Sequence, residues 1–308
     1  MENRIKTLAG QAAPRKNTPP AKLPMSVNFM RLFFRHLGPV FPQTAAKAAS
    51  RLFFYPKQYK SPEWQKSLLQ DRREFRIPFG KSSLQAYHWH ATEGKPTALL
   101  VHGWENEAAH FQGFIEPLLA KGFGVVMFDA PAHGRSRFQN QTNMFEYGLA
   151  IETVIKHFGN IHTLIGHSMG AAASLYRFGK SENLHVQQMV FISCPTDIRA
   201  IFTRFREMLY LPEKVLRKMQ LSMKQRFNID DDIYDLSQVC QFVQAERVLI
   251  VHDKRDAVVP FGDAERMLNA WPKANFLFTE NFGHNRIIRE SEPITEIVDF
   301  VSETVVSA

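Results

Sequence analysis

Short apolar runs alternate with longer amphipathic segments over residues 74–308. Apolar residues dominate the runs, which is typical of central parallel strands that are covered on both faces. The segments between them carry apolar residues at the three- and four-residue spacing of a helix that buries one side. The runs lie at 97–101, 125–128, 161–165, 188–193, 247–251 and 275–278, and the helical segments lie at 111–119, 144–158, 264–271 and 293–301.

A predicted hairpin, formed by residues 75–80 and 84–90, precedes the first of these runs. Its two strands bring the expected sheet to eight strands. Strands that alternate with helices of this length indicate a parallel sheet with helices on both faces. We therefore predict an α/β fold with a mostly parallel eight-stranded sheet.

Residues 196–241 interrupt the alternation after the sixth strand. This insertion is rich in Arg and Met and has helical spacing, with apolar residues such as Phe202, Leu209 and Met219. We predict that it forms a helical lid over the carboxyl edge of the sheet. Flexible Met side chains suit a surface that packs on varied apolar ligands. Alternatively, they fill gaps beneath the lid.

Two segments precede the sheet. Residues 1–24 are rich in Pro, Lys, Ala and Thr without periodicity, which predicts a disordered basic tail. Residues 25–73 are predicted to form an amphipathic helical extension in which apolar residues such as Phe29 are interleaved with basic ones such as Arg31. Three interpretations of the extension remain open. It packs on the α/β body, contacts an anionic membrane surface through residues 25–60, or serves as an organellar transit segment.

The formal net charge of +8 is concentrated in the first quarter of the chain. Residues 1–76 carry 15 Lys and Arg against 4 Asp and Glu, whereas the remaining residues carry 23 against 26. A protein that binds nucleic acid over its body carries basic patches there. We therefore expect no nucleic-acid partner.

The composition indicates a cytoplasmic protein without a cofactor. Cys194 and Cys240 have no motif spacing, which favours two reduced core thiols. No apolar run approaches the ~18 residues that span a bilayer, and we expect neither a transmembrane segment nor a secretory leader. No cluster of histidines or carboxylates suggests a metal, and no phosphate loop or dinucleotide fingerprint is present. We predict a cytoplasmic location, with membrane association as an alternative.

The sequence Gly-His-Ser-Met-Gly at residues 166–170 directly follows the apolar run at 161–165. Three alanines come next, so the order is strand, turn and helix. A turn this sharp leaves no room for side chains two residues before and two residues after Ser168, a condition that glycine meets. The Ser168 hydroxyl is then exposed at the carboxyl edge of the sheet, as in a nucleophile elbow.

A serine nucleophile needs a base within hydrogen-bond reach, and the base needs a carboxylate that orients it. Downstream of Ser168, Asp256 follows the run at 247–251 and His284 follows the run at 275–278. Both lie where strands end at the carboxyl edge, which is where α/β sheets gather their active residues. We therefore predict Ser168, Asp256 and His284 as a catalytic set, with Asp253 as an alternative acid.

Other histidines are expected to have structural roles. His102 and His133 lie in turns that contain glycine and are predicted to shape these loops through hydrogen bonds. His167 precedes Ser168 directly, but the elbow is expected to point its ring away from the hydroxyl.

These motifs resemble the α/β-hydrolase superfamily, in its serine esterase-like branch with a helical lid. The resemblance covers residues 74–308. In this branch the acid stands in an Asp-x-x-Val-Pro motif, which implies Asp256, whereas the position of Asp253 is usually Gly. The oxyanion hole of the fold uses the backbone N–H after the nucleophile, here Met169, and the resemblance points to the Trp104 N–H as the second donor. The matching segments are 102–104, 129–136, 166–170, 256–260 and 283–284.

The resemblance implies a serine hydrolase that cleaves carboxylic esters through an acyl-enzyme intermediate on Ser168. An apolar acyl group is expected because the predicted lid is rich in Met. Thioesters, amides, carbon–carbon bonds or acyl transfer to an alcohol would use the same three residues. A non-catalytic ligand-binding protein is a further alternative, because a fold does not imply an activity. The sequence specifies neither the substrate nor an oligomeric state.

Overall fold

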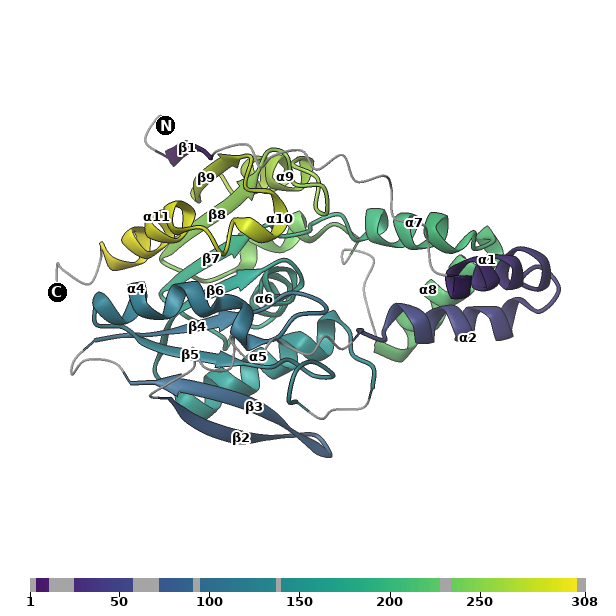
Figure 1. The fold of residues 1–308 in the computed structure, drawn as a ribbon, viewed down its shortest axis with the longest axis horizontal. Helices are drawn as coiled ribbons and strands as arrows, with labels where there is room; N and C mark the ends of the chain where they lie inside the picture. The colour runs from purple at the N-terminus through teal and green to yellow at the C-terminus, as the bar shows by residue number, and fades with distance from the viewer. Residues whose placement is uncertain are drawn as a thin grey trace. The chain divides into compact units, whose positions relative to one another are not determined.

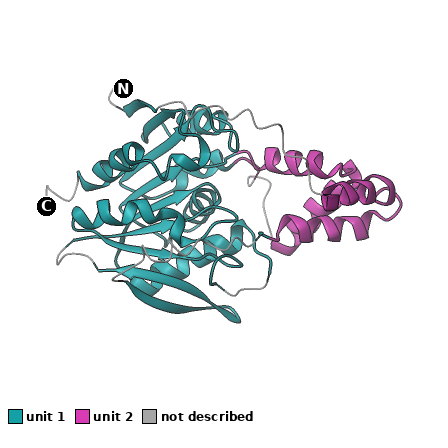
Figure 2. Cartoon of the chain, viewed as in Figure 1, with its two compact units in different colours: residues 1–13, 56–196, 236–308 teal, residues 14–55, 197–235 magenta. Residues whose placement is uncertain are grey.

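The computed structural model describes residues 4–10, 25–57, 72–90, 95–136, 140–227 and 234–303. The chain forms two compact units (Figure 1, Figure 2). The sheet unit comprises residues 1–13, 56–196 and 236–308, and the helical unit comprises residues 14–55 and 197–235. Each unit is therefore built from segments that are far apart in the sequence.

One nine-stranded sheet forms the sheet unit, in the order β1-β9-β8-β7-β6-β4-β5-β3-β2 (Figure 1). The strands are β1 (Ile5–Ala9), β2 (Arg73–Phe79), β3 (Ser82–Trp89), β4 (Thr97–Val101), β5 (Gly124–Phe128), β6 (Ile161–His167), β7 (Gln188–Ile192), β8 (Arg247–Asp253) and β9 (Asn275–Glu280). Strand β3 runs antiparallel to β2 and to β5, and every other neighbouring pair is parallel. The predicted α/β class with a mostly parallel sheet is confirmed.

Strand β1 corrects two predictions, a disordered tail over residues 1–24 and a sheet of eight strands. It pairs in parallel with β9, from Ile5 opposite Phe276 to Ala9 opposite Glu280. Main-chain hydrogen bonds hold an edge strand of this kind. Its side chains remain largely exposed, so they leave no apolar pattern in the sequence. Residues 1–3 and 11–24 lie outside the described part of the chain.

Helices cover both faces of the sheet, as parallel strands require. They are the 3₁₀ helices η2 (Ala108–Phe114) and η4 (Leu236–Phe242) and the α-helices α4 (Ile115–Ala120), α5 (Met144–Phe158), α6 (Met169–Gly179), α9 (Gly262–Ala270), α10 (Gly283–Arg286) and α11 (Ser291–Ser302). On one face, strand residues such as Leu100 and Ile165 pack with η2, α4 and α11. Neighbouring residues such as Leu99 and Leu164 point to the other face and are also fully buried. Helix α6 packs there against α5 and η4.

Helix α5 shows how local sequence sets the ends of an element. The Asn143 side chain accepts hydrogen bonds from the Phe145 and Glu146 N–H groups at 2.9 and 3.0 Å. It satisfies donors that the start of a helix leaves without partners. Gly159, with φ 74°, ends the helix in the left-handed conformation. The helix predicted at 144–158 has these same bounds.

The helical unit joins the N-terminal helices to the insertion that follows β7 (Figure 2). Its helices are α1 (Met25–Leu37), α2 (Pro42–Phe53), α7 (Ile198–Leu209) and α8 (Glu213–Phe227). Helix α1 packs with α7 and α2, and α2 packs with α8. The Phe53 ring stacks on Phe202 and meets Phe205 edge-on, with 4.9 Å between ring centroids in both pairs. The N-terminal extension therefore packs on the insertion helices.

The observed boundaries differ from the predicted ones at three points. The helical extension ends at Phe53, and Arg73 already belongs to β2, so the predicted limits of 25–73 and 74–308 are displaced. Residues 58–71 lie outside the described residues. The insertion contributes residues 197–235 to the helical unit, because η4 packs against α6 and α9 of the sheet unit. The lid role of residues 196–241 stays a prediction.

In the described ranges, no helix is long and apolar enough to cross a membrane.

Candidate active site

Ser168 lies between β6 and α6, at the carboxyl end of the strand. Its φ of 53° is rare for a residue that has a side chain. A Cβ on Gly170 would overlap the main-chain oxygen of Val101, and a Cβ on Gly166 would come within 2.9 Å of the Ala171 backbone. Only glycine fits these two positions without a shift of the backbone. The strand, tight turn and helix that the sequence predicts are all present.

The end of β4 lies against this turn. A Cβ on Gly103 would come within 3.1 Å of the Ser168 Cβ, so the Gly103–Trp104 segment borders the serine side chain. The Trp104 N–H donates to no acceptor in the part of the chain that the structure describes. Met169 is the first residue of α6, where a helix offers N–H groups without partners. The role of the Trp104 and Met169 N–H groups as oxyanion donors stays a prediction.

His284 lies in the short helix α10 after β9, within hydrogen-bond distance of Ser168. Its Nε2 is 3.1 Å from the Ser168 Oγ, and its Nδ1 is 2.7 Å from the Asp256 Oδ2. Because a carboxylate accepts at Nδ1, that nitrogen carries the proton, and Nε2 accepts from the serine hydroxyl. The structure thus brings Ser168, His284 and Asp256 into one hydrogen-bonded series.

The Asp256 carboxylate is fully buried and accepts hydrogen bonds at both oxygens. Oδ1 accepts from the Val258 and Val259 N–H groups at 2.7 and 2.9 Å, and Oδ2 faces His284. Burial by itself raises the pKa of a carboxyl group. The hydrogen bond and charge of His284, with the two backbone N–H groups, outweigh burial and hold the pKa of Asp256 below its usual value. Asp256 is therefore ionised at neutral pH.

Asp253, the alternative acid, bonds to other groups. Its Oδ2 accepts from the Thr279 hydroxyl at 2.8 Å and from the Phe282 N–H at 2.9 Å. The carboxylate joins the end of β8 to the end of β9 and to Phe282, in the segment that leads into His284. Asp256, and not Asp253, contacts the His284 ring.

Strand β1 also supports the loop that carries His284. The Gly10 N–H donates to the Glu280 oxygen at 2.9 Å, and the Asn281 side chain donates to the Gly10 oxygen at 3.2 Å. A Cβ on Gly10 would come within 2.6 Å of the Phe282 ring. Asn281 has a φ of 72°, a conformation that its bond to Gly10 helps to hold. The apolar pattern of the sequence contains no signal of this support.

His167 contacts His284 as well, which sequence reasoning missed. Its buried Nε2–H donates to the main-chain oxygen of His284 at 2.9 Å, and the two ring centroids are 4.7 Å apart. Burial, together with the neighbouring His284 and His110 rings, lowers the pKa of His167 well below its usual value. The ring is therefore neutral. Adjacency to Ser168 is the only signal of this contact in the sequence.

Two further histidines shape the loops near Trp104. The Nε2 of His102 accepts from the Ala130 N–H, and the Nε2 of His133 accepts from the Glu105 N–H, both at 3.0 Å. Their Nδ1 atoms donate to backbone oxygens. Burial lowers the pKa of His133 to about 4 and lowers that of His102 well below its usual value. Both rings are neutral and bonded to loop backbone, as their predicted structural role requires.

The arrangement at Ser168 can move a proton and form a covalent bond. Transfer from the Ser168 hydroxyl to His284 creates an alkoxide-like nucleophile, and Asp256 stabilises the imidazolium that results. Across the described ranges, no group of three or more His, Cys, Asp or Glu side chains is arranged to hold a metal ion.

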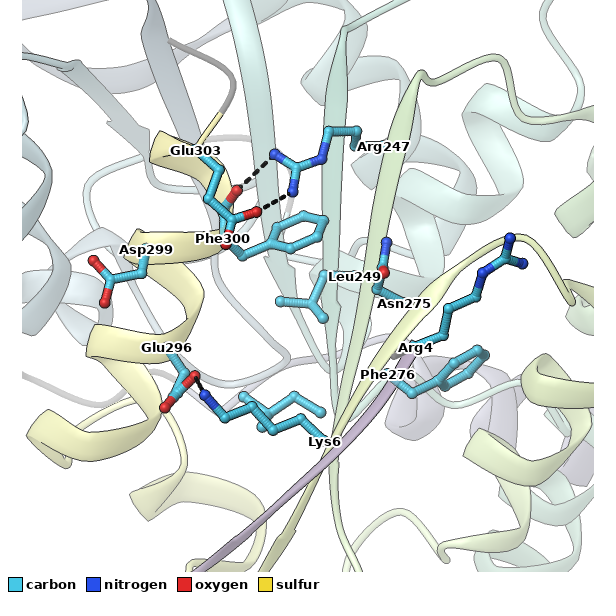
Figure 3. Close-up of a pocket in the computed structure, with 11 residues that line it drawn as sticks. Arg4, Lys6, Arg247, Leu249, Asn275, Phe276, Glu296, Asp299, Phe300 and Glu303 are labelled. Carbon is cyan, nitrogen blue, oxygen red and sulfur yellow. Dashed lines mark hydrogen bonds and ion pairs between the residues drawn. The ribbon is translucent and has the colours of Figure 1, made fainter. Parts of the chain in front are cut away.

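A cavity of about 400 Å³ lies at the opposite end of the strands (Figure 3). Arg247 and Asn275, the first residues of β8 and β9, line it together with α11. Arg247 pairs with Glu303 at 2.6 Å, and Lys6 pairs with Glu296 at 2.5 Å. The three candidate site residues follow the carboxyl ends of their strands, so this cavity is separate from them.

Comparison with known proteins identifies a family. The sequence model of the family described as "Alpha/beta hydrolase family" matches residues 98–277, which is more than half of the chain. No curated protein matches the chain significantly.

Several solved structures share the fold. An esterase of Pyrococcus furiosus is 21% identical with a TM-score of 0.59, and the match covers 82% of this chain and 98% of the esterase. A bacterial membrane phospholipase A is 16% identical with a TM-score of 0.60, and the match covers 92% and 99% of the two chains. The thioesterase domain from the curacin biosynthetic pathway is 17% identical with a TM-score of 0.54, and the match covers 74% and 99%.

Proposed function

Because the chain belongs to the alpha/beta hydrolase family, we propose that it is a serine hydrolase that cleaves carboxylic esters through an acyl-enzyme on Ser168. One observation carries the proposal. The Ser168 Oγ, the His284 ring and the Asp256 carboxylate are linked in series at 3.1 and 2.7 Å. The three residues follow three different strands, β6, β8 and β9, at one edge of the sheet, and this fold gathers its active residues at that edge.

In the first half-reaction, the Ser168 Oγ attacks the carbonyl carbon of the ester while the His284 Nε2 takes the hydroxyl proton. A serine hydroxyl is a weak nucleophile at neutral pH, so loss of its proton during the attack supplies the reactivity. Asp256 holds the His284 Nδ1–H and stabilises the positive ring. His284 then gives the proton to the departing oxygen, and the alcohol leaves.

The tetrahedral intermediate carries a negative charge on the former carbonyl oxygen. We assign the Met169 and Trp104 N–H groups as its donors. The Met169 N–H lies at the start of α6, where the helix dipole adds to the attraction for an anion. Loss of one such donor typically costs about 3 kcal/mol of transition-state stabilisation. Because both donors are main-chain groups, a Trp104→Ala variant tests the shape of the pocket and not the oxyanion hole.

The second half-reaction uses the same residues in the reverse direction. His284 removes a proton from water, and the resulting hydroxide attacks the acyl carbon. The tetrahedral intermediate collapses, Ser168 leaves with the proton that His284 returns to its Oγ, and the carboxylic acid is released.

Esters are our first choice of substrate, and thioesters are our second. Two of the similar structures are named an esterase and a phospholipase, and the third is named a thioesterase. An apolar acyl group fits the Met-rich insertion that the sequence predicts to be a lid. Amide hydrolysis, carbon–carbon cleavage and acyl transfer to an alcohol would use the same three residues and are alternatives.

We also propose a cytoplasmic location. Cys194 and Cys240 are both buried free thiols, which fits a reducing compartment. Burial raises the pKa of Cys194 well above its usual value, so this thiol stays protonated and inert.

The test is hydrolysis of p-nitrophenyl esters of increasing acyl length, together with labelling by a fluorophosphonate. We expect the wild-type protein to turn over the esters and to be labelled, and Ser168→Ala to fold normally and do neither. Appreciable turnover by Ser168→Ala overturns the assignment of the nucleophile. A wild-type protein that is not labelled and cleaves neither esters nor thioesters supports the non-catalytic alternative.

A further inference from the structure

Helix α1 has an apolar face that is largely exposed in the described structure. Met25, Phe29 and Leu32 recur at the four- and three-residue spacing that places side chains on one side of a helix. Their exposed fractions are 88%, 75% and 58%. Phe34 lies on the opposite side of α1 and is buried. The helix is therefore seated in the helical unit by one side and presents a second apolar side, the α1 apolar face, to solvent.

The last residue of α1 and the turn that follows it carry more exposed apolar side chains. Leu37, Val40 and Phe41 precede α2 and have exposed fractions of 46%, 65% and 59%. Single exposed apolar residues are ordinary, whereas a concentration of large ones in one short segment marks a surface that binds something.

The charge of the helical unit indicates what this surface binds. The unit holds 15 Lys and Arg against 7 Asp and Glu, whereas the sheet unit holds 23 of each. The formal net charge of the whole chain, +8, therefore resides on the helical unit. Helices α1 and α2 contain no acidic residue, and Arg35, Lys47 and Arg51 are exposed on them. A basic surface of this kind is attracted to the anionic headgroups of lipids.

We propose that the α1 apolar face docks on an anionic lipid bilayer. Helix α1 lies in the plane of the interface, with Met25, Phe29 and Leu32 among the acyl chains and the basic residues of the helical unit at the headgroups. Amphipathic helices with basic flanks bind bilayers in this way. Fluid acyl chains rearrange around the side chains that project from α1. The α1 apolar face therefore needs no complementary groove in this partner. A second copy of the chain is a poor occupant, because two units of like charge repel each other.

Co-sedimentation of the whole chain with lipid vesicles tests the proposal. One set of vesicles contains equal parts of phosphatidylcholine and phosphatidylserine, and the other contains phosphatidylcholine alone. The variants are Phe29→Asp, Leu32→Asp and the control Leu149→Asp, which changes an exposed apolar residue of α5 in the sheet unit. All three residues are exposed, so the variants are expected to fold, which far-ultraviolet circular dichroism verifies.

We expect the wild-type protein and Leu149→Asp to bind the mixed vesicles alike, and Phe29→Asp and Leu32→Asp to bind them about tenfold more weakly or less. Each substitution removes an inserted apolar side chain and adds a charge that anionic lipid repels. Binding to phosphatidylcholine alone should be much weaker, because each basic residue near an anionic surface contributes about fivefold to the partition coefficient.

Three outcomes overturn the proposal. The first is a wild-type protein that does not bind the mixed vesicles. The second is equal binding by the wild-type protein and both α1 variants, which would assign binding to charge alone. The third is a wild-type dimer, detected by sedimentation velocity without lipid, that Phe29→Asp converts to a monomer. In that case a second copy covers the face.

Discussion

The His167 Nε2–H donates a hydrogen bond of 2.9 Å to the main-chain oxygen of His284. The residue before the proposed nucleophile therefore holds the residue that we propose as the base. Because His167 and Ser168 are consecutive, one strand end positions both partners of the proton transfer. The efficiency of such a transfer depends on the geometry of the donor and the acceptor.

His167→Phe tests whether this hydrogen bond matters for catalysis. The variant keeps an aromatic ring in the buried site and removes the donor. We expect kcat for a p-nitrophenyl ester to fall about fivefold to tenfold, because a neutral hydrogen bond contributes roughly 1 kcal/mol. KM should change little, because the bond holds the base and not the substrate. His162→Phe, a half-buried position on the same strand, is the control, and a wild-type kcat for His167→Phe would contradict the prediction.

Asp253, the last residue of β8, and Asp256, in the segment that follows, should affect different quantities, the first stability and the second kcat. Asp256→Asn is expected to lower kcat by about 10⁴-fold, because an amide does not accept the His284 Nδ1–H and favours the wrong tautomer. Its Oδ1 can still accept from the Val258 and Val259 N–H groups, so the free energy of unfolding should change little. Steady-state kinetics and urea denaturation separate the two effects.

Asp253→Asn should instead lower the free energy of unfolding and affect kcat less. Its amide would place an NH₂ group either at the Oδ1 position, against the Arg255 N–H, or at the Oδ2 position, against the Phe282 N–H and the Thr279 hydroxyl. An unsatisfied buried group of this kind costs about 1–3 kcal/mol of stability. We expect a lower free energy of unfolding and a smaller loss of kcat than for Asp256→Asn. A larger loss of kcat in Asp253→Asn would make Asp253 the acid.

The sequence predicts the positions of Ser168, Asp256 and His284 because each has a local signal. Two glycines flank Ser168, and the other two residues follow apolar runs that read as strands. The choice between Asp253 and Asp256 is different. Both lie near the end of β8, so their positions alone do not separate them; the resemblance implies Asp256, and the path of the loop brings Asp256 to His284.

The supports of the His284 loop could not be predicted from residue patterns. Gly10 acts through its own main-chain atoms, and the His167 ring bonds to a main-chain oxygen of His284; the main-chain side of each contact leaves no mark in the sequence. The helical unit shows the same limit. The apolar stripe of an amphipathic helix indicates that one side is buried, but it does not identify the partner, which for α1 is a helix of the distant insertion.

Gly10→Val tests the support that β1 provides. A Cβ at this position would come within 2.6 Å of the Phe282 ring, so the ring or the strand must move. We expect kcat to fall severalfold because His284 follows Phe282 closely in the chain. Thr7→Val, which changes an exposed position of β1, is the control and should retain wild-type kinetics. Wild-type kcat in Gly10→Val would show that catalysis does not depend on the close contact between Gly10 and Phe282.

Acid should destabilise the protein through buried neutral histidines, of which His133 is the best placed for a test. Burial lowers the pKa of His133 from 6.5 to about 4, and its Nε2 must stay unprotonated to accept from the Glu105 N–H. The unfolded chain therefore takes up this proton near pH 6.5, and the folded chain takes it up only near pH 4. The stability that the neutral ring confers is complete above pH 6.5 and is lost as the pH falls from 6.5 to 4. Burial of His110 acts in the same direction, because it lowers the pKa of this residue to about 3.

Urea denaturation at several pH values between about 7 and 5 measures this effect. Each such histidine lowers the free energy of unfolding by up to about 1.4 kcal/mol per pH unit in this range. His133→Gln removes one titrating group, so its free energy of unfolding should depend less steeply on pH by about one proton. His185→Gln, which changes an exposed histidine, should keep the wild-type slope. Equal slopes for His133→Gln and the wild-type protein would mean that the folded protein accommodates a charged His133, and that the loop holding Glu105 does not depend on the neutral ring.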